Sequence, residues 1–152
     1  MSILDIQRIF QGEGLPSNEQ FKGWVDAALS EENQDCEIVI RIVDENESAA
    51  LNQQYRQKPG PTNILSFAFA APENIGLNLL GDIVICAAVV EKEAQQQNKA
   101  INDHWAHITI HGILHLQGYD HIEEHEAELM EAQEITILHT LNLNNPYVQE
   151  NK

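Results

Sequence analysis

Three histidines stand close together in the stretch HGILHLQGYDH, residues 111 to 121. They are His111, His115 and His121, at spacings of four and six residues. Side chains four residues apart lie on one face of a helix, so the first two imidazoles can bind one metal ion together. A third ligand on that face could not complete a tetrahedron, so the chain must turn, and Gly118 allows the positive φ that ends a helix. The spacing therefore predicts a metal site to which His121 returns from another direction.

Other histidine pairs on the predicted helix offer competing ligand sets. His107 with His111 has the same spacing of four residues, and so has His121 with His125. We prefer His111 and His115 because they stand closest to the glycine that brings His121 back. The remaining histidines are expected to be packing or surface residues: His104, His107, His125 and His139.

Three neutral imidazoles suit Zn²⁺, and we expect one zinc ion per chain. Three protein ligands leave the fourth position to water, whose pKa zinc can lower to about 7. That arrangement is typical of a catalytic site. A purely structural zinc would need a fourth protein ligand, and the candidates are Asp120 and the two distant cysteines. Asp120 is poorly placed for this role because it stands directly beside His121.

The residue after the first histidine is Gly112. The spacing of the three histidines and Gly118 resembles the metzincin peptidase skeleton, which carries glutamate where this chain has Gly112. That glutamate moves a proton from the attacking water to the leaving amine, which amide cleavage requires. A phosphodiester needs less help, because a metal and an arginine can stabilise charge on phosphate oxygens. Peptidase activity is therefore disfavoured, although a metallopeptidase-like hydrolase remains an alternative.

The charge of the chain limits how it can bind a polyanion. Its 152 residues carry a formal net charge of −16, so nucleic acid must be held by a local site and not by a broad basic face. Arg56 and Lys58 precede a Pro/Gly turn and could grip a phosphate. They could equally be the solvated end of a helix, where cations favour the dipole. The residues alone leave this choice open.

The chain alternates strand and helix patterns without linkers or repeats. We expect a single domain over residues 1–152 with an α/β (α+β) fold, in which about five helices pack on one small mixed sheet. The N-terminus does not resemble a signal peptide, no apolar run is long enough to span a membrane, and both cysteines fit a reduced core. We therefore expect a cytoplasmic protein.

Alternation and capping residues predict where these elements lie. The acidic run over 122–134 is interpreted as the solvated face of the last helix. Strands are predicted at 3–10, 36–43, 64–70 and from 79, where the last strand runs on into a helix. Other helices are predicted from Ser17 to about Leu29, from Asp44 to about Arg56, over 103–117 and over 122–142.

Three segments resemble the YbeY family of bacterial rRNA maturation factors, in the same order along the chain. They are YRQKPGPTNILSF (55–67), LLGDIVIC (79–86) and the histidine motif (111–121). The resemblance implies an α/β fold with a zincin-like histidine helix and a bound zinc. It also implies a single-strand-specific endoribonuclease that acts in maturation of the 3′ end of small-subunit ribosomal RNA and in ribosome quality control.

The resemblance also assigns residues. It makes His111, His115 and His121 the zinc ligands, and Arg56 matches the arginine of the family's YR segment. We therefore predict Arg56 as the catalytic residue that steadies the anionic phosphate. Asn63 stands where the family commonly has aspartate, which puts any role of a charge there in doubt.

The sequence thus predicts a zinc-dependent endoribonuclease. The expected partners are single-stranded RNA, ribosomal RNA and the small ribosomal subunit, with no role for DNA or a membrane. The nucleophile is either water or the 2′-hydroxyl of the RNA. A non-catalytic ribosome-assembly factor with a structural zinc is the other alternative.

Overall fold

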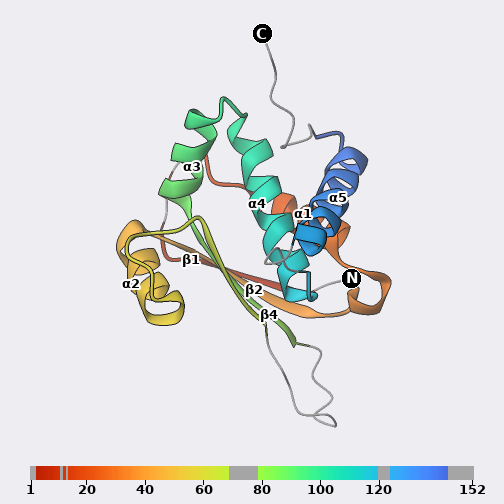
Figure 1. Cartoon of the computed structure of the whole chain (residues 1–152), viewed down its shortest axis with the longest axis horizontal. Coiled ribbons are helices and arrows are strands. Elements are labelled where there is room, and N and C mark those ends of the chain that lie inside the picture. The colour runs from red at the N-terminus through yellow and green to blue at the C-terminus, as the bar shows by residue number, and fades with distance from the viewer. Residues whose placement is uncertain (1–2, 11, 13, 69–78, 120–123, 144–152) are drawn as a thin grey trace.

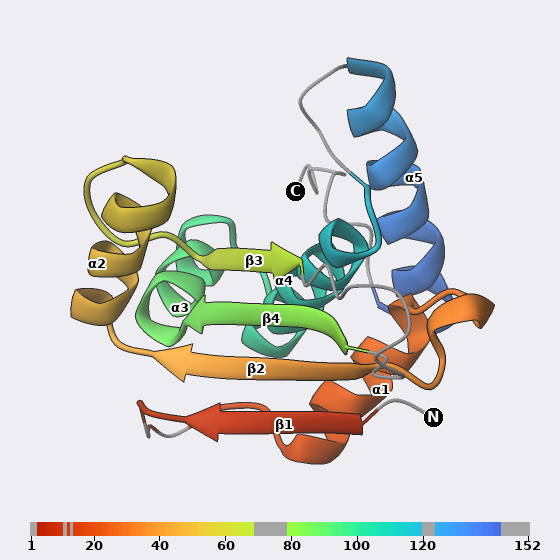
Figure 2. The ribbon, with the colours of Figure 1, turned by 90° about the horizontal axis from the view of Figure 1, so that it is seen from below.

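A computed structural model describes residues 3–10, 12, 14–68, 79–119 and 124–143 (Figure 1). Over these ranges it has one four-stranded sheet in the order β1-β2-β4-β3. Strands β1, β2 and β4 are parallel, and β3 is antiparallel to β4 (Figure 2). The strands are β1 Ile3–Arg8, β2 Glu37–Val43, β3 Ile64–Ala68 and β4 Leu79–Cys86. The predicted mixed sheet is therefore confirmed.

Alternating isoleucines explain why β2 and β4 form the centre of this sheet. Ile40 pairs with Ile83, and Ile42 pairs with Ile85 in the register of the two strands. All four side chains are fully buried, so one face of the sheet is a continuous aliphatic surface.

Five α-helices lie in the described parts of the chain, as the sequence predicted. They are α1 Asn18–Ala28, α2 Glu45–Arg56, α3 Ala87–Gln96, α4 Ile101–Leu116 and α5 Glu124–Thr140, with a short 3₁₀ turn at Glu31–Asn33. The capping box of Ser17 and Gln20 begins α1, and the Asp44 side chain accepts from the Glu47 amide to begin α2.

Helix α4 is the central helix of the molecule. It packs against the sheet, on the face that carries the buried isoleucines of β2 and β4, and against α1, α3 and α5 (Figure 1). Trp105, Ile110 and Ile113 are fully buried on it, because neighbours surround the helix on most sides. Helix α2 lies beyond the carboxyl ends of β2 and β4 (Figure 2), and its Leu51 packs on a second, smaller core that includes Leu65. Side chains on α4 are therefore held by several elements at once.

Some predicted boundaries were wrong by about two residues. Strand β1 ends at Arg8 because the amides of Ile9 and Phe10 both donate to the Ile42 carbonyl, which breaks the regular ladder. Helix α4 begins at Ile101, and α5 ends at Thr140 because Asn142 takes a left-handed φ of 61°. The predicted ends at 69–70 and 122–123 lie outside the described residues.

Two further findings concern membrane-spanning helices and the cysteines. No helix in the described ranges is long and apolar enough to cross a membrane. Cys36 and Cys86 are both buried and free, as expected of reduced core residues.

Candidate metal centre

The carboxyl end of α4 carries two of the three predicted ligands. Gly118 has a φ of 100°, and its amide donates to the His115 carbonyl, while the Tyr119 amide donates to Leu114. These two bonds form a Schellman motif, so the glycine ends the helix as the sequence predicted. His121 itself lies outside the described residues.

His111 and His115 face each other across one helical turn. Their Nε2 atoms lie 3.1 Å apart, and their ring centroids lie 4.6 Å apart at an interplanar angle of 77°. The His111 side chain keeps 23% of its surface exposed, so the pair is accessible from outside. The two nitrogens converge as two ligands of one ion do.

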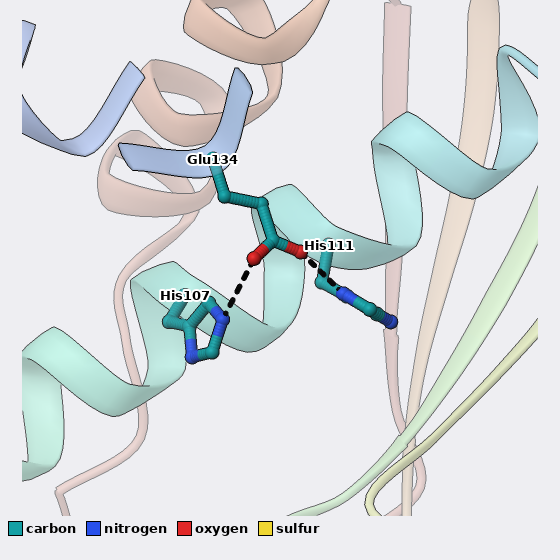
Figure 3. A group of neighbouring side chains, drawn as sticks. All are labelled: His107, His111 and Glu134. Carbon is teal, nitrogen blue, oxygen red and sulfur yellow. Dashed lines mark hydrogen bonds and ion pairs between the residues drawn. The ribbon is translucent and has the colours of Figure 1, made fainter. Parts of the chain in front are cut away.

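A buried carboxylate stands on the other side of His111. Glu134 of α5 is fully buried, and its two oxygens form one hydrogen bond with Nδ1 of His111 and another with Nε2 of His107, the latter at 3.2 Å. Figure 3 shows the carboxylate reaching from α5 to a point between the two imidazoles of α4. His111 therefore uses both ring nitrogens, one toward Glu134 and one toward His115.

His107, His111 and Glu134 together form a group that could hold a metal ion. This group shares His111 with the predicted pair, so the structure offers two ligand sets around one residue. Burial lowers the pKa of His107, although the Glu134 carboxylate opposes that shift. The uncharged imidazole, which is the form that binds metals, is thereby favoured at His107.

The interpretation of the acidic run as a solvated face was wrong at Glu134. The other described glutamates of that run whose side chains can be placed, Glu126, Glu128 and Glu131, are exposed as predicted. Glu134 is buried because it lies on the same helical stripe as Met130 and Leu138, four residues to either side. That spacing was visible in the sequence and would have marked one carboxylate as facing the core.

The remaining histidines follow the prediction that they are packing or surface residues. His104 is buried and its Nε2 lies 3.0 Å from Oε1 of Glu93 on α3. His125 and His139 are exposed on α5.

Asn63 belongs to this second histidine–carboxylate contact. Its Nδ2 donates to both oxygens of Glu93, at 3.1 and 3.3 Å. Burial alone would raise the pKa of Glu93, but the bonds from His104 and Asn63 outweigh it and hold the pKa below its usual value. The amide thus links the start of β3 to α3 and α4.

Asn63→Asp is expected to lower stability at neutral pH by about 1–3 kcal/mol, because a carboxylate replaces a donor beside Glu93. The two carboxyls would share one proton, which raises the pKa of the pair above its unfolded value. A carboxyl whose pKa is higher in the native state than in the unfolded state stabilises the fold once it is protonated. The stability lost through Asn63→Asp should therefore shrink as pH falls from 8 to 5. Urea unfolding at both pH values measures this. Asn63→Ala is the control: it should lose stability without recovering in acid, and equal pH profiles would contradict the argument.

Gly112 faces the sheet. An added Cβ would lie 2.5 Å from Cδ1 of Ile64 and 3.3 Å from Cγ2 of Ile83. The glycine therefore has a packing reason, because it lets α4 approach β3 and β4 closely. The sequence had suggested only that a catalytic glutamate is missing there.

Arg56 is the last residue of α2 and is exposed. Within the described ranges no hydrogen bond or ion pair joins it to His111 or His115. The neighbouring Tyr55 ring, 57% exposed, packs edge-on against Phe67 at 5.0 Å. The structure thus brings the two histidines together and leaves Arg56 exposed, so its predicted phosphate contact stays a prediction.

Fold and site define a class of protein: a small mixed-sheet α+β protein whose central helix presents a histidine group able to hold a metal ion. Comparison with known proteins narrows this class. The family model described as "Endoribonuclease YbeY" matches residues 11–142. The chain belongs to the YbeY endoribonuclease family.

Relatives and a solved structure agree with this membership. A protein of Colwellia psychrerythraea named endoribonuclease YbeY is 53% identical over 97% of this chain and 98% of its own length. One of Methylococcus capsulatus with the same name is 59% identical over 88% of this chain and 87% of its own. The solution structure of a Thermotoga maritima protein matches with a TM-score of 0.59 and 26% identity, covering 93% of this chain and 92% of that one.

Proposed function

We propose that this chain is a zinc-dependent endoribonuclease that cleaves single-stranded RNA. As a member of the YbeY family it is an enzyme that hydrolyses RNA. The observation that carries the metal dependence is the approach of the His111 and His115 Nε2 atoms to 3.1 Å, with Glu134 bonded to the far side of His111.

The proposed ligands are His111, His115 and His121, with one zinc per chain. Two nitrogens at about 2.0–2.1 Å from a tetrahedral zinc stand about 3.3 Å apart, close to the separation of this pair. When bound, zinc supplies a Lewis acid that polarises a phosphoryl oxygen and acidifies a water molecule. His121 belongs to the set on the sequence spacing and the family resemblance, supported by the helix end at Gly118.

Arg56 is proposed to hold the scissile phosphate. Its guanidinium is exposed and not engaged by the described residues, so two N–H groups can donate to two phosphate oxygens. The nucleophile is either water or the RNA 2′-hydroxyl. A cyclic phosphate at the product end would identify the 2′-hydroxyl, and a linear 5′-phosphate would identify water.

Within the family assignment, the proposed substrate is ribosomal RNA at the 3′ end of the small-subunit molecule, with a part in ribosome quality control. Because the chain carries a net charge of −16, it should hold RNA through contacts to a few phosphates at one local site. Single-stranded segments can adapt their shape to such a site. We further propose that the protein is cytoplasmic and that residues 1–152 form one domain. The one sheet found in the described residues, with the helices packed on it, supports the single domain.

The test combines metal analysis with cleavage. The purified chain is expected to hold close to one zinc and to cut a defined single-stranded RNA, but not the same RNA annealed to its complement. A chain that holds zinc and binds ribosomal RNA without cutting any RNA would instead be an assembly factor, and the proposal would fail.

Arg56→Ala is expected to retain zinc and fold while cleavage slows by about 30- to 1,000-fold. A charge-assisted contact that strengthens in the transition state contributes roughly 2 to 4 kcal/mol. Single-turnover cleavage, measured beside zinc content, separates the two effects. Arg56→Lys should recover only part of the rate, because an ammonium lacks the planar fork.

The matched control for this prediction is Lys58→Ala, an exposed cation two residues away. It should slow cleavage much less, since a flexible ammonium acts mainly at long range. Wild-type cleavage by Arg56→Ala would make Arg56 only a solvated helix end.

A further inference from the structure

Glu134 is an ionisable group placed where water cannot reach it. Its side chain is 0% exposed and lies between α4 and α5, among buried Met130 and Leu138. A carboxylate buried in this way is strongly unfavourable unless hydrogen bonds to it are made. Both of its oxygens are hydrogen-bonded to imidazoles, one to His107 and one to His111. These two bonds account for how the fold tolerates the charge, but not for why it is there.

The direction of these bonds decides which nitrogen of His111 carries its proton. When Glu134 is ionised it can only accept, so the His111 nitrogen beside it, Nδ1, then carries the hydrogen. A neutral imidazole has one N–H, and the lone pair of His111 is therefore on Nε2. That atom is the one directed at His115. Glu134 thus presents the lone pair of His111 on the side where the second imidazole lies.

We propose that Glu134 is the positioning residue of the metal centre, selecting the His111 tautomer and fixing its ring, and is not itself a ligand. The inference rests on the proposed metal site of His111 and His115. His107 is then the second anchor of the carboxylate, holding its other oxygen at 3.2 Å so that it cannot rotate away from His111.

The rival is that His107, His111 and Glu134 hold the ion themselves. In that arrangement His111 would coordinate through Nδ1, and its Nε2 would point away from the ion toward His115. Glu134 would also give up its hydrogen bonds with both imidazoles and offer one oxygen to the ion. The rival gives His115 no role, although its Nε2 lies 3.1 Å from that of His111.

Glu134→Gln distinguishes the two arrangements. If Glu134 only positions His111, the Glu134→Gln variant should still bind one metal ion, but its zinc affinity should be about 10- to 100-fold weaker. Competition with a chromophoric chelator measures this affinity. The absorption spectrum of the cobalt-substituted protein should keep its band positions and intensity, because the ligands are unchanged. Glutamine fits the site, since its oxygen can accept from His111 while His107 changes tautomer to accept from its amide.

Glu131→Gln is the matched control, because Glu131 is an exposed carboxylate on the same helix. It should bind zinc as the wild type does. If a folded Glu134→Gln binds no metal, or its cobalt bands change, Glu134 is a ligand and the proposal is wrong. Unchanged zinc affinity in Glu134→Gln would also overturn it.

Nitrogen-detected NMR of the metal-free wild type tests the same proposal without any variant, so a misfolded Glu134→Gln would not leave it undecided. His111 is expected as the Nδ1–H tautomer, and an Nε2–H signal for that residue would contradict it. None of these readouts uses RNA. A wild type that binds zinc but cuts no RNA would refute the proposed function and leave this inference standing, whereas a wild type that binds no metal would refute both.

Discussion

His115→Ala is expected to lose most of its zinc and, with it, RNA cleavage. The imidazole of His115 is one half of the nitrogen pair at 3.1 Å, and two remaining ligands hold zinc poorly. Without the ion, several kcal/mol of stabilisation of the developing charge disappear, so cleavage should fall by about 1,000-fold or more. Zinc content of the purified variant and single-turnover cleavage of one RNA measure the two losses.

Two histidine controls belong with this experiment. His139→Ala removes an exposed imidazole from α5 and should change neither zinc nor cleavage. His107→Ala separates the ligand sets: it should retain bound zinc if His115 is a ligand, and lose it if the ion is held with Glu134. Full zinc content in His115→Ala would remove that residue from the ligand set.

Local patterns were sufficient to predict most of the fold. Alternating isoleucines in β2 and the caps at Ser17 and Asp44 act through neighbours in sequence, so strand and helix types followed directly. The ends of the strands and helices were harder to predict, because hydrogen bonds to residues far away in the sequence set some of them. The Ile42 carbonyl, which accepts two amides from the end of β1, belongs to another strand.

The candidate site divides in the same way. His111, His115 and the turn at Gly118 lie on one helix and its end, so helical geometry alone could predict their arrangement. Glu134 comes from α5, and only the packing of that helix against α4 shows that it meets His111. Its position inside an acidic run concealed the apolar stripe on which it lies.

Gly112 shows how a missing residue can mislead. A comparison with peptidases suggests that Gly112 is glycine because this enzyme needs no catalytic base there. In the structure the same position lies at the interface between α4 and the sheet, where Ile64, Ser66 and Ile83 leave no room for a long side chain. A glutamate there would point into the core and not toward a substrate.

Gly112→Glu is therefore expected to prevent folding and not to create a peptidase. Its Cβ would lie 2.5 Å from Cδ1 of Ile64 and 3.4 Å from Oγ of Ser66, and its carboxylate would be buried without a partner. Crowding of this kind costs about 1–3 kcal/mol, and an unpaired buried charge adds several more. A domain of this size is stable by roughly 5–15 kcal/mol, so most of that stability would disappear. Circular dichroism, urea unfolding and zinc content measure the loss.

Two glycine variants make this result specific to position 112. Gly112→Ala meets chiefly the flexible end of Ile64, so it should fold with a loss of about 1–3 kcal/mol. Gly23→Glu adds the same charge on α1, where a Cβ meets nothing within 4 Å, and it should fold normally. If Gly112→Glu folded with wild-type stability, the close packing of α4 on the sheet would be wrong. If it also cleaved casein in a chelator-sensitive manner, a missing catalytic base would again be the better explanation of the glycine.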